Sequence, residues 1–229
     1  MLSKNVETFM GCDWEPAEAD TILFGAPFDS TTSYRPGTRF GSSAIRHESF
    51  GLEDYSPYQD KDLSQVKTAD IGDLELCIGD TARVLDQIEE CAAEILAAGK
   101  RPFMLGGEHL VTLGAFRAAV KRYPDLHVIH FDAHADLRED YLGMPLSHAC
   151  VLRRCWELAG DGKIFQFGIR SGDRAEFAWG KDHVTTRKFD FEGLEETLDR
   201  LKGKPVYFTL DLDVMDPSVF PDRKSTRLN

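Results

Sequence analysis

Apolar and polar positions alternate along the chain in blocks that predict a series of strands and helices. Short apolar runs rich in β-branched and aromatic residues predict strands at residues 21–25, 66–71, 101–105, 128–131, 164–169 and 205–210. Apolar residues spaced three and four apart predict helices that start near residues 42, 80, 108, 147 and 191. Strands that alternate with helices are typical of an α/β fold, in which helices cover both faces of a parallel sheet.

A glycine pair separates one predicted strand from the helix that follows it. Gly106 and Gly107 come directly after the strand at 101–105 and predict a tight turn. Glu108 and His109 are the expected first residues of the next helix. In the last predicted helix, over residues 191–202, three residues are expected to face the core: Leu194, Leu198 and Leu201.

Composition and charge narrow the class of protein. With 229 residues, 42% of them hydrophobic, the chain can bury one sizeable core, and we expect one domain. The formal charge of −12 disfavours nucleic acid and acidic membrane surfaces as partners and suits a cationic ligand. No apolar run has transmembrane length and no secretion leader is recognisable, so we expect a soluble, cytoplasmic protein.

The cysteines argue against a disulfide framework or a thiolate zinc site. They are odd in number, scattered, and never spaced as Cys-x-x-Cys. We therefore expect five reduced residues in or near the core: Cys12, Cys77, Cys91, Cys150 and Cys155.

Candidate metal ligands follow the ends of three predicted strands. They are two imidazoles and four carboxylates: His109, Asp132, His134, Asp136, Asp211 and Asp213. Because sites in parallel sheets form beyond the carboxyl ends of the strands, we expect these groups to converge. Four carboxylates suit two divalent ions about 3.5 to 4 Å apart better than one ion. Oxygen donors mixed with imidazole favour Mn(II), with Zn, Fe, Co or Ni as competitors, and the implied chemistry is hydrolysis.

Each of these motifs alone has an ordinary structural explanation. The acids at 132–136 could belong to a solvated loop, and His109 could cap or pack a helix start. Asp211 and Asp213 could form a turn. Their placement at three strand ends favours the metal centre over these alternatives.

Three motifs together resemble one enzyme family. Gly-Gly-Glu-His at 106–109, Asp-Ala-His-Ala-Asp at 132–136 and Asp-Leu-Asp-Val-Met-Asp-Pro at 211–217 are similar to the signatures of the ureohydrolase (arginase and agmatinase) superfamily. The resemblance extends over residues 25–221. It implies a three-layer α/β/α sandwich of the arginase/deacetylase-like type. It also implies two Mn²⁺ ions whose bridging hydroxide hydrolyses a guanidinium group to urea and an amine.

The resemblance also implies roles for individual residues. One ion would be held by His109 and Asp136 and the other by His134 and Asp213, with Asp132 and Asp211 bridging them. Asp136 would accept a hydrogen bond from the hydroxide and pass its proton to the leaving amine. His148 matches the family histidine that exchanges protons with solvent, with a helix-start cap as its alternative role.

The expected substrate is agmatine, which would yield putrescine and urea for polyamine biosynthesis. The segment at 137–143 and the loop at 33–41 resemble the bacterial agmatinase branch. Agmatine has no carboxylate, so it needs no cationic clamp. Guanidinobutyrate or another ω-guanidino acid is the alternative, with Arg138 or an arginine of the loop at 33–41 as a candidate partner of its carboxylate. Tyr34 is a second candidate substrate contact, although its loop could equally be a solvated connection.

The end of the sequence departs from the family pattern. Family chains continue after Asp216-Pro217 to a glutamate that pairs with the guanidinium, and residues 222–229 do not resemble that continuation. We expect residues 1–221 to form one C-terminally truncated ureohydrolase domain with poor activity or folding, followed by a non-family tail at 222–229. A non-catalytic ureohydrolase-like subunit and a mononuclear deacetylase are alternatives. The family implies a homo-oligomer, a trimer or hexamer.

Overall fold

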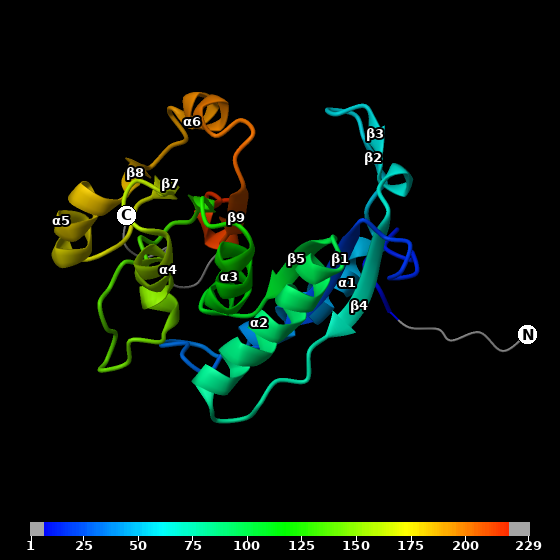
Figure 1. Ribbon diagram of the computed structural model, residues 1–229, viewed down its shortest axis with the longest axis horizontal. Coiled ribbons are helices and arrows are strands. Elements are labelled where there is room, and N and C mark those ends of the chain that lie inside the picture. The colour runs from blue at the N-terminus through cyan, green and yellow to red at the C-terminus, as the bar shows by residue number, and fades with distance from the viewer. Residues whose placement is uncertain (1–6, 220–229) are drawn as a thin grey trace, which may run out of the picture.

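The strands of the chain form two parallel sheets (Figure 1), in a computed structural model that describes residues 7–219. The first has the order β4-β1-β5: Thr68–Asp73, Thr21–Ala26 and Arg101–Gly106. The second has the order β8-β7-β6-β9: Thr185–Lys188, Ile164–Ile169, His127–Phe131 and Val206–Leu210. A separate antiparallel hairpin joins β2 (Tyr55–Ser56) to β3 (Lys61–Asp62).

Six α-helices connect and cover the strands in the described part of the chain. They are α1 (Gly41–Ser49), α2 (Thr81–Ala97), α3 (Val111–Arg122), α4 (Val151–Ala159), α5 (Arg174–His183) and α6 (Leu194–Arg200). Short 3₁₀ turns lie at Thr38–Phe40 (η1), Leu63–Gln65 (η2), His148–Cys150 (η3) and Leu212–Val214 (η4). Helix α3 packs between α2 and α4, while α1 contacts β1 and β5.

Side chains of β6 and β7 alternate between two cores, because successive strand residues point to opposite faces. Val128 and Ile164 belong to the large core that α2, α3 and α4 complete. Ile129 and Phe165 belong to a second cluster that Leu201 covers, just after α6. Both faces of β6 and β7 are therefore buried, and the parallel pairing of the strands confirms the predicted parallel α/β fold.

The structure corrects two helix limits. Helix α3 begins at Val111 rather than at Glu108, because Val111 N and Thr112 N bond the carbonyls of Glu108 and His109 in a tighter turn. Helix α6 begins only at Leu194, after Gly193 in the left-handed region with φ 79°. Leu201 is buried as expected.

The structure differs from the sequence-based expectation in the burial of two residues and in two additional elements. Leu198 is 48% exposed, although it was expected to face the core, because the helix is only a short turn over the sheet edge. Cys77 is exposed, while the other four cysteines are buried or half-buried and all five are free. Helix α5 and strand β8 were not predicted, since their apolar residues are few and irregularly spaced.

The expected single sheet is divided between β5 and β9. Within residues 7–219, β5 pairs with β1 alone and β9 pairs with β6 alone. Both strands line a cleft of about 1900 Å³. The carboxyl ends of the two strands nevertheless meet, because Nε2 of His109 lies 2.9 Å from the Thr209 hydroxyl. The expected domain boundary at 221 and the tail at 222–229 lie outside the described residues.

Candidate metal centre

The turn after β5 delivers His109 to the cleft. Gly107 N donates to the carbonyl of Ala26, and Glu108 N donates to the carbonyl of Phe28. A Cβ added to Gly107 would lie 1.9 Å from the Phe28 carbonyl oxygen, so this position requires glycine. The tight turn leaves the His109 side chain only 6% exposed at the base of the cleft.

The end of β6 supplies three of the candidate ligands. Asp132 is fully buried, while His134 and Asp136 line the cleft. Asp136 has a left-handed backbone with φ 52°, a conformation that aspartate tolerates better than most residues. Its carbonyl accepts hydrogen bonds from Leu152 N at 3.0 Å and Arg153 N at 3.3 Å, so the start of α4 holds this conformation.

The turn η4 after β9 supplies the last two carboxylates. Asp211 caps the turn by accepting a 3.0 Å hydrogen bond from Asp213 N. Asp213 in turn accepts a 3.1 Å bond from Ala133 N, which ties the turn to the end of β6. The turn role considered for this pair is therefore real, and both side chains also line the cleft.

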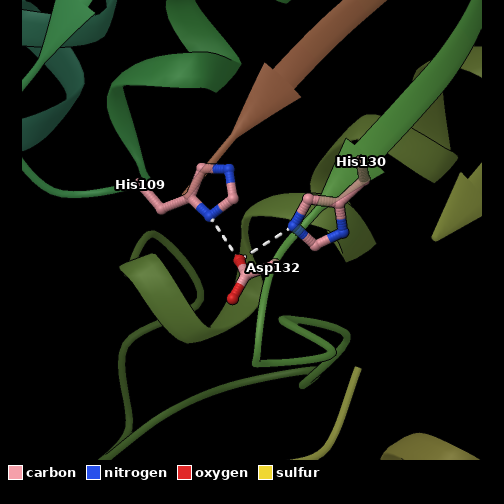
Figure 2. A group of neighbouring side chains, drawn as sticks. All are labelled: His109, His130 and Asp132. Carbon is pink, nitrogen blue, oxygen red and sulfur yellow. Dashed lines mark hydrogen bonds and ion pairs between the residues drawn. The ribbon is translucent and has the colours of Figure 1, made fainter. Parts of the chain in front are cut away.

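Asp132 stands between the two candidate histidines. Its Oδ2 lies 3.0 Å from Nδ1 of His109, a contact visible in Figure 2. Its Oδ1 lies 3.5 Å from Nδ1 of His134. The two oxygens of one carboxylate thus face two different imidazoles, as a shared ligand would.

The other three carboxylates lie around the two histidines. Nδ1 of His109 lies 3.1 Å from Asp136 Oδ2 and 3.9 Å from Asp211 Oδ2. Nδ1 of His134 lies 2.9 Å from Asp213 Oδ2. All six residues predicted from the sequence are therefore brought together, with Asp136 and Asp211 near His109 and Asp213 near His134.

The crowded carboxylates and imidazoles shift one another's pKa values. Burial opposes protonation of His134, but its contacts with Asp132 and Asp213 raise its pKa to about 11. For His109, too, the carboxylates outweigh burial and raise the pKa well above its usual value. Burial, together with the charges of Asp132 and Asp213, raises the pKa of Asp211 to about 7.

This donor set fits divalent cations. The buried Nδ1 of His109 makes no hydrogen bond of good geometry, although carboxylate oxygens lie on the side it faces. Cations would neutralise the carboxylates that otherwise hold extra protons. Imidazole nitrogens and carboxylate oxygens suit first-row divalent metals, and no cysteine lies in either metal-binding group among the described residues.

Comparison with known proteins agrees with this geometry. The model of the arginase family matches residues 19–222. The chain belongs to the arginase family. This family comprises dinuclear-metal guanidino hydrolases, which agrees with the two ligand groups.

Relatives and solved structures of the family match most of the chain. An agmatinase of Bacillus subtilis is 52% identical over 211 residues, which cover 91% of this chain and 72% of the relative. An N(1)-aminopropylagmatine ureohydrolase of Thermococcus kodakarensis is 40% identical over 213 residues, or 90% of this chain and 72% of that one. The crystal structure of an agmatine ureohydrolase of Thermoplasma volcanium superposes with a TM-score of 0.84 at 36% identity, covering 94% of this chain and 74% of that chain.

The other candidate residues of this arginase-family chain lie in different surroundings. His148 lines the cleft at the start of η3, and the ring of Tyr141 packs edge-on against it at 5.5 Å. Tyr34 lines the cleft and is 55% exposed. Arg138 is not among the lining residues, and its Nε lies 3.3 Å from Glu176 Oε2.

Sequence reasoning missed several residues that support the ligands. His130, on the same face of β6 as Asp132, places its Nε2 2.8 Å from Asp132 Oδ2 (Figure 2). Its position two residues before an aspartate in a strand could have indicated this contact. Arg170 donates to the carbonyls of the β9 turn, and Thr209 contacts His109. Nothing in the sequence pattern indicates these last two, because they are distant along the chain from the residues they contact.

Proposed function

We propose that this chain hydrolyses the guanidinium group of agmatine to putrescine and urea. The observation that carries the proposal is the convergence of two imidazoles and four carboxylates from three strand ends at the base of one open cleft. Membership of the arginase family and the 52% identity to an agmatinase support the same chemistry.

The ligands divide between two ions in this proposal. His109 and Asp136 would hold one ion and His134 and Asp213 the other, and Asp132 and Asp211 would be shared. When bound, the ions supply Lewis-acid activation of a water molecule at neutral pH. Mn²⁺ is the proposed metal, because the donors are mainly carboxylate oxygens with one imidazole for each ion.

Asp136 and His148 are the proposed proton-transfer residues. Water adds to the guanidinium carbon, the bond from that carbon to the alkyl-bearing nitrogen breaks, and both water protons finish on the leaving amine. Asp136 lines the cleft beside the ligand groups, so its carboxylate can accept one proton and return it to the amine nitrogen. His148 lines the same cleft with a side chain 15% exposed, so it can exchange protons with solvent.

The charge at the base of the cleft favours a cationic guanidinium group. Carboxylates line its base, and the chain as a whole carries a formal charge of −12. Arg138, the proposed clamp for a substrate carboxylate, is already engaged with Glu176 outside the cleft lining. Arg35 of the loop at 33–41 also lines the cleft, so the preference for agmatine over guanidinobutyrate rests on the 52% identity to an agmatinase. Tyr34 remains the proposed contact for the substrate chain.

A comparison of guanidines tests the proposal. The full chain, loaded with Mn²⁺, is incubated at high concentration with agmatine, 4-guanidinobutyrate or arginine, and urea and the amine are both quantified. We expect urea and putrescine in equal amounts, and a kcat/KM for agmatine above that for the other two compounds. The Asp136→Asn variant is the control, because it keeps the size of the side chain and removes its basicity.

Other outcomes would identify the alternative functions. Two bound ions and no urea from any guanidine would favour a non-catalytic ureohydrolase-like subunit. One bound ion per chain would favour a mononuclear deacetylase-like site. Preferred turnover of 4-guanidinobutyrate would move the substrate to the ω-guanidino acids.

The cellular setting is part of the same proposal. We place the enzyme in polyamine biosynthesis in the cytoplasm, as a trimer or hexamer. Among residues 7–219 no helix has the length and apolar character needed to span a membrane. Light scattering of the purified chain tests the oligomeric state.

A further inference from the structure

We infer that His130 is a positioning residue, which donates a hydrogen bond from Nε2 to Asp132 and binds no metal itself. Gln166 on the neighbouring strand fixes this role by fixing the tautomer of the imidazole. The inference rests on the proposed metal centre, but the fixed tautomer can be tested without catalysis.

His130 has two possible roles in this site. Its ring, that of His109 and the carboxylate of Asp132 bring ligand atoms within 4.8 Å of one another, a spacing that could hold an ion (Figure 2). Alternatively, Nε2 carries a proton and donates it to Asp132 Oδ2, 2.8 Å away. The two roles exclude each other, because a protonated ring nitrogen has no lone pair for a metal.

The amide of Gln166 decides between these roles. Its Nε2 lies 2.7 Å from the carbonyl oxygen of Ala135, which can only accept a hydrogen bond. Its Oε1 lies 3.0 Å from the hydroxyl of Thr186, which donates to it. The carbonyl contact requires the amide nitrogen on this side, and the hydroxyl, which can donate or accept, is compatible with the same orientation, so the nitrogen is the atom that faces His130.

The second amide proton then fixes the imidazole. Gln166 Nε2 lies 3.0 Å from Nδ1 of His130, and it donates there. Nδ1 therefore accepts, and the ring proton of the neutral tautomer sits on Nε2, where it points to Asp132. All three side chains are completely or almost completely buried, so water does not compete for these bonds.

The hydrogen bond leaves the carboxylate free to bind metal. Oδ2 of Asp132 has two lone pairs, one for the His130 N–H and one directed elsewhere, and Nδ1 of His109 lies 3.0 Å from the same oxygen. Oδ1 is held separately by a 2.6 Å bond from His134 N. Asp132 is thus held from both sides, which would orient it as a carboxylate shared by two ions.

Metal titration of variants tests the role. The amide nitrogen of a glutamine can reach the position of Nε2, so His130→Gln keeps the donor, whereas His130→Leu removes it. We expect two Mn²⁺ ions per chain in both variants, with a dissociation constant raised 10- to 100-fold in His130→Leu and less than 10-fold in His130→Gln. His127→Gln is the matched control, because His127 is a buried histidine of the same strand whose Nδ1 contacts the Asp125 carbonyl. Loss of one ion per chain in His130→Leu would make His130 a ligand and overturn the inference.

Nitrogen-15 NMR of the metal-free protein tests the tautomer directly and does not depend on a variant that folds. We expect Nε2 of His130 to be protonated and Nδ1 to be unprotonated, and the opposite tautomer would overturn the inference. Absence of urea production would defeat the proposed function and leave this result unchanged.

Discussion

The hydroxyl of Thr209 lies 2.9 Å from Nε2 of His109, on the side of the ring away from the carboxylates. Thr209 is itself held at 3.1 Å by the hydroxyl of Thr112. If Nε2 of His109 donates to Thr209, its Nδ1 is free to bind a cation. Metal-binding histidines are commonly oriented by such a bond through their second nitrogen.

Replacing Thr209 by valine should weaken metal binding. Valine has the same shape but cannot accept the His109 N–H, so the ring loses the bond that orients it. We expect a 10- to 100-fold higher dissociation constant for Mn²⁺ with two ions still bound, measured by calorimetric titration. Thr197→Val is the control, because its hydroxyl bonds only a carbonyl near the start of its own helix. Equal affinity in Thr209→Val and the unchanged protein would show that the contact does not orient the ligand.

The candidate metal ligands could be located from the sequence because each of the three motifs that carry them follows a strand. An apolar run that ends in Asp-x-His-x-Asp fixes both the position of the carboxylates and their location at the sheet edge. The supporting residues could not be predicted in this way. Gln166 and Thr209 contact the site through neighbouring strands, so their roles depend on strand order and register. The division of the sheet between β5 and β9 depends on pairing over the whole chain, which no local pattern encodes.

Arg170 should stabilise the turn that carries Asp211 and Asp213. Its guanidinium donates to the backbone carbonyls of Asp213, Val214 and Met215, at 3.1 Å for Val214 and 3.2 Å for Met215. Lysine cannot bond three carbonyls in this planar arrangement. We expect Arg170→Lys to lower the free energy of unfolding by about 1.5–3 kcal/mol, the contribution of one hydrogen bond to a charged group.

Chemical denaturation and Mn²⁺ titration measure this effect. The ion proposed to bind His134 and Asp213 should bind more weakly in Arg170→Lys, because Asp213 lies in the turn that the substitution loosens. Arg174→Lys, at an exposed position on α5, is the matched control. A variant with unchanged stability and unchanged metal affinity would contradict a role for Arg170 in holding this turn.

The metal-free protein should lose stability as the pH rises. The pKa of His134 is about 11 in the folded chain, against about 6.5 in the unfolded chain, so its contribution is full below pH 6.5 and declines above it. The pKa of Asp211 is raised from 3.8 to about 7, so the folded state also binds more protons there and loses stability as that proton leaves.

Thermal unfolding in EDTA and in Mn²⁺ tests this pH dependence. We expect the Tm in EDTA to fall between about pH 6 and about pH 9, because the unfolded chain releases the His134 proton that the folded chain must keep, and Asp211 loses its proton near pH 7. Mn²⁺ should remove most of this decline, since cations take the place of the protons. A Tm in EDTA that rises over the same pH range would contradict the idea that protons on His134 and Asp211 stabilise the metal-free protein.

Glu108 should position His148 through Thr31. Oε1 of Glu108 accepts bonds from Thr31 N at 3.1 Å and from its hydroxyl at 2.7 Å. The Thr31 hydroxyl oxygen in turn accepts a 3.1 Å bond from His148 N, at the start of η3. Replacing Thr31 by valine removes the hydroxyl that links Glu108 to the His148 backbone. The side chains of Glu108 and His148 are unchanged.

Thr32 offers a matched comparison, because its hydroxyl bonds the same carboxylate at 3.2 Å, whereas the backbone N–H of His148 bonds the hydroxyl of Thr31. We expect Thr31→Val to lower kcat about 10-fold with two Mn²⁺ ions retained, a loss within the range of general acid–base contributions. Thr32→Val should change kcat less than about 3-fold, since it leaves the hydrogen bond between Thr31 and the His148 backbone intact.

If both variants lose activity equally, Glu108 acts by holding the loop as a whole and has no specific effect on His148. The pH profile of kcat separates the two explanations, because displacement of His148 alters the profile whereas a loosened loop lowers kcat equally at every pH.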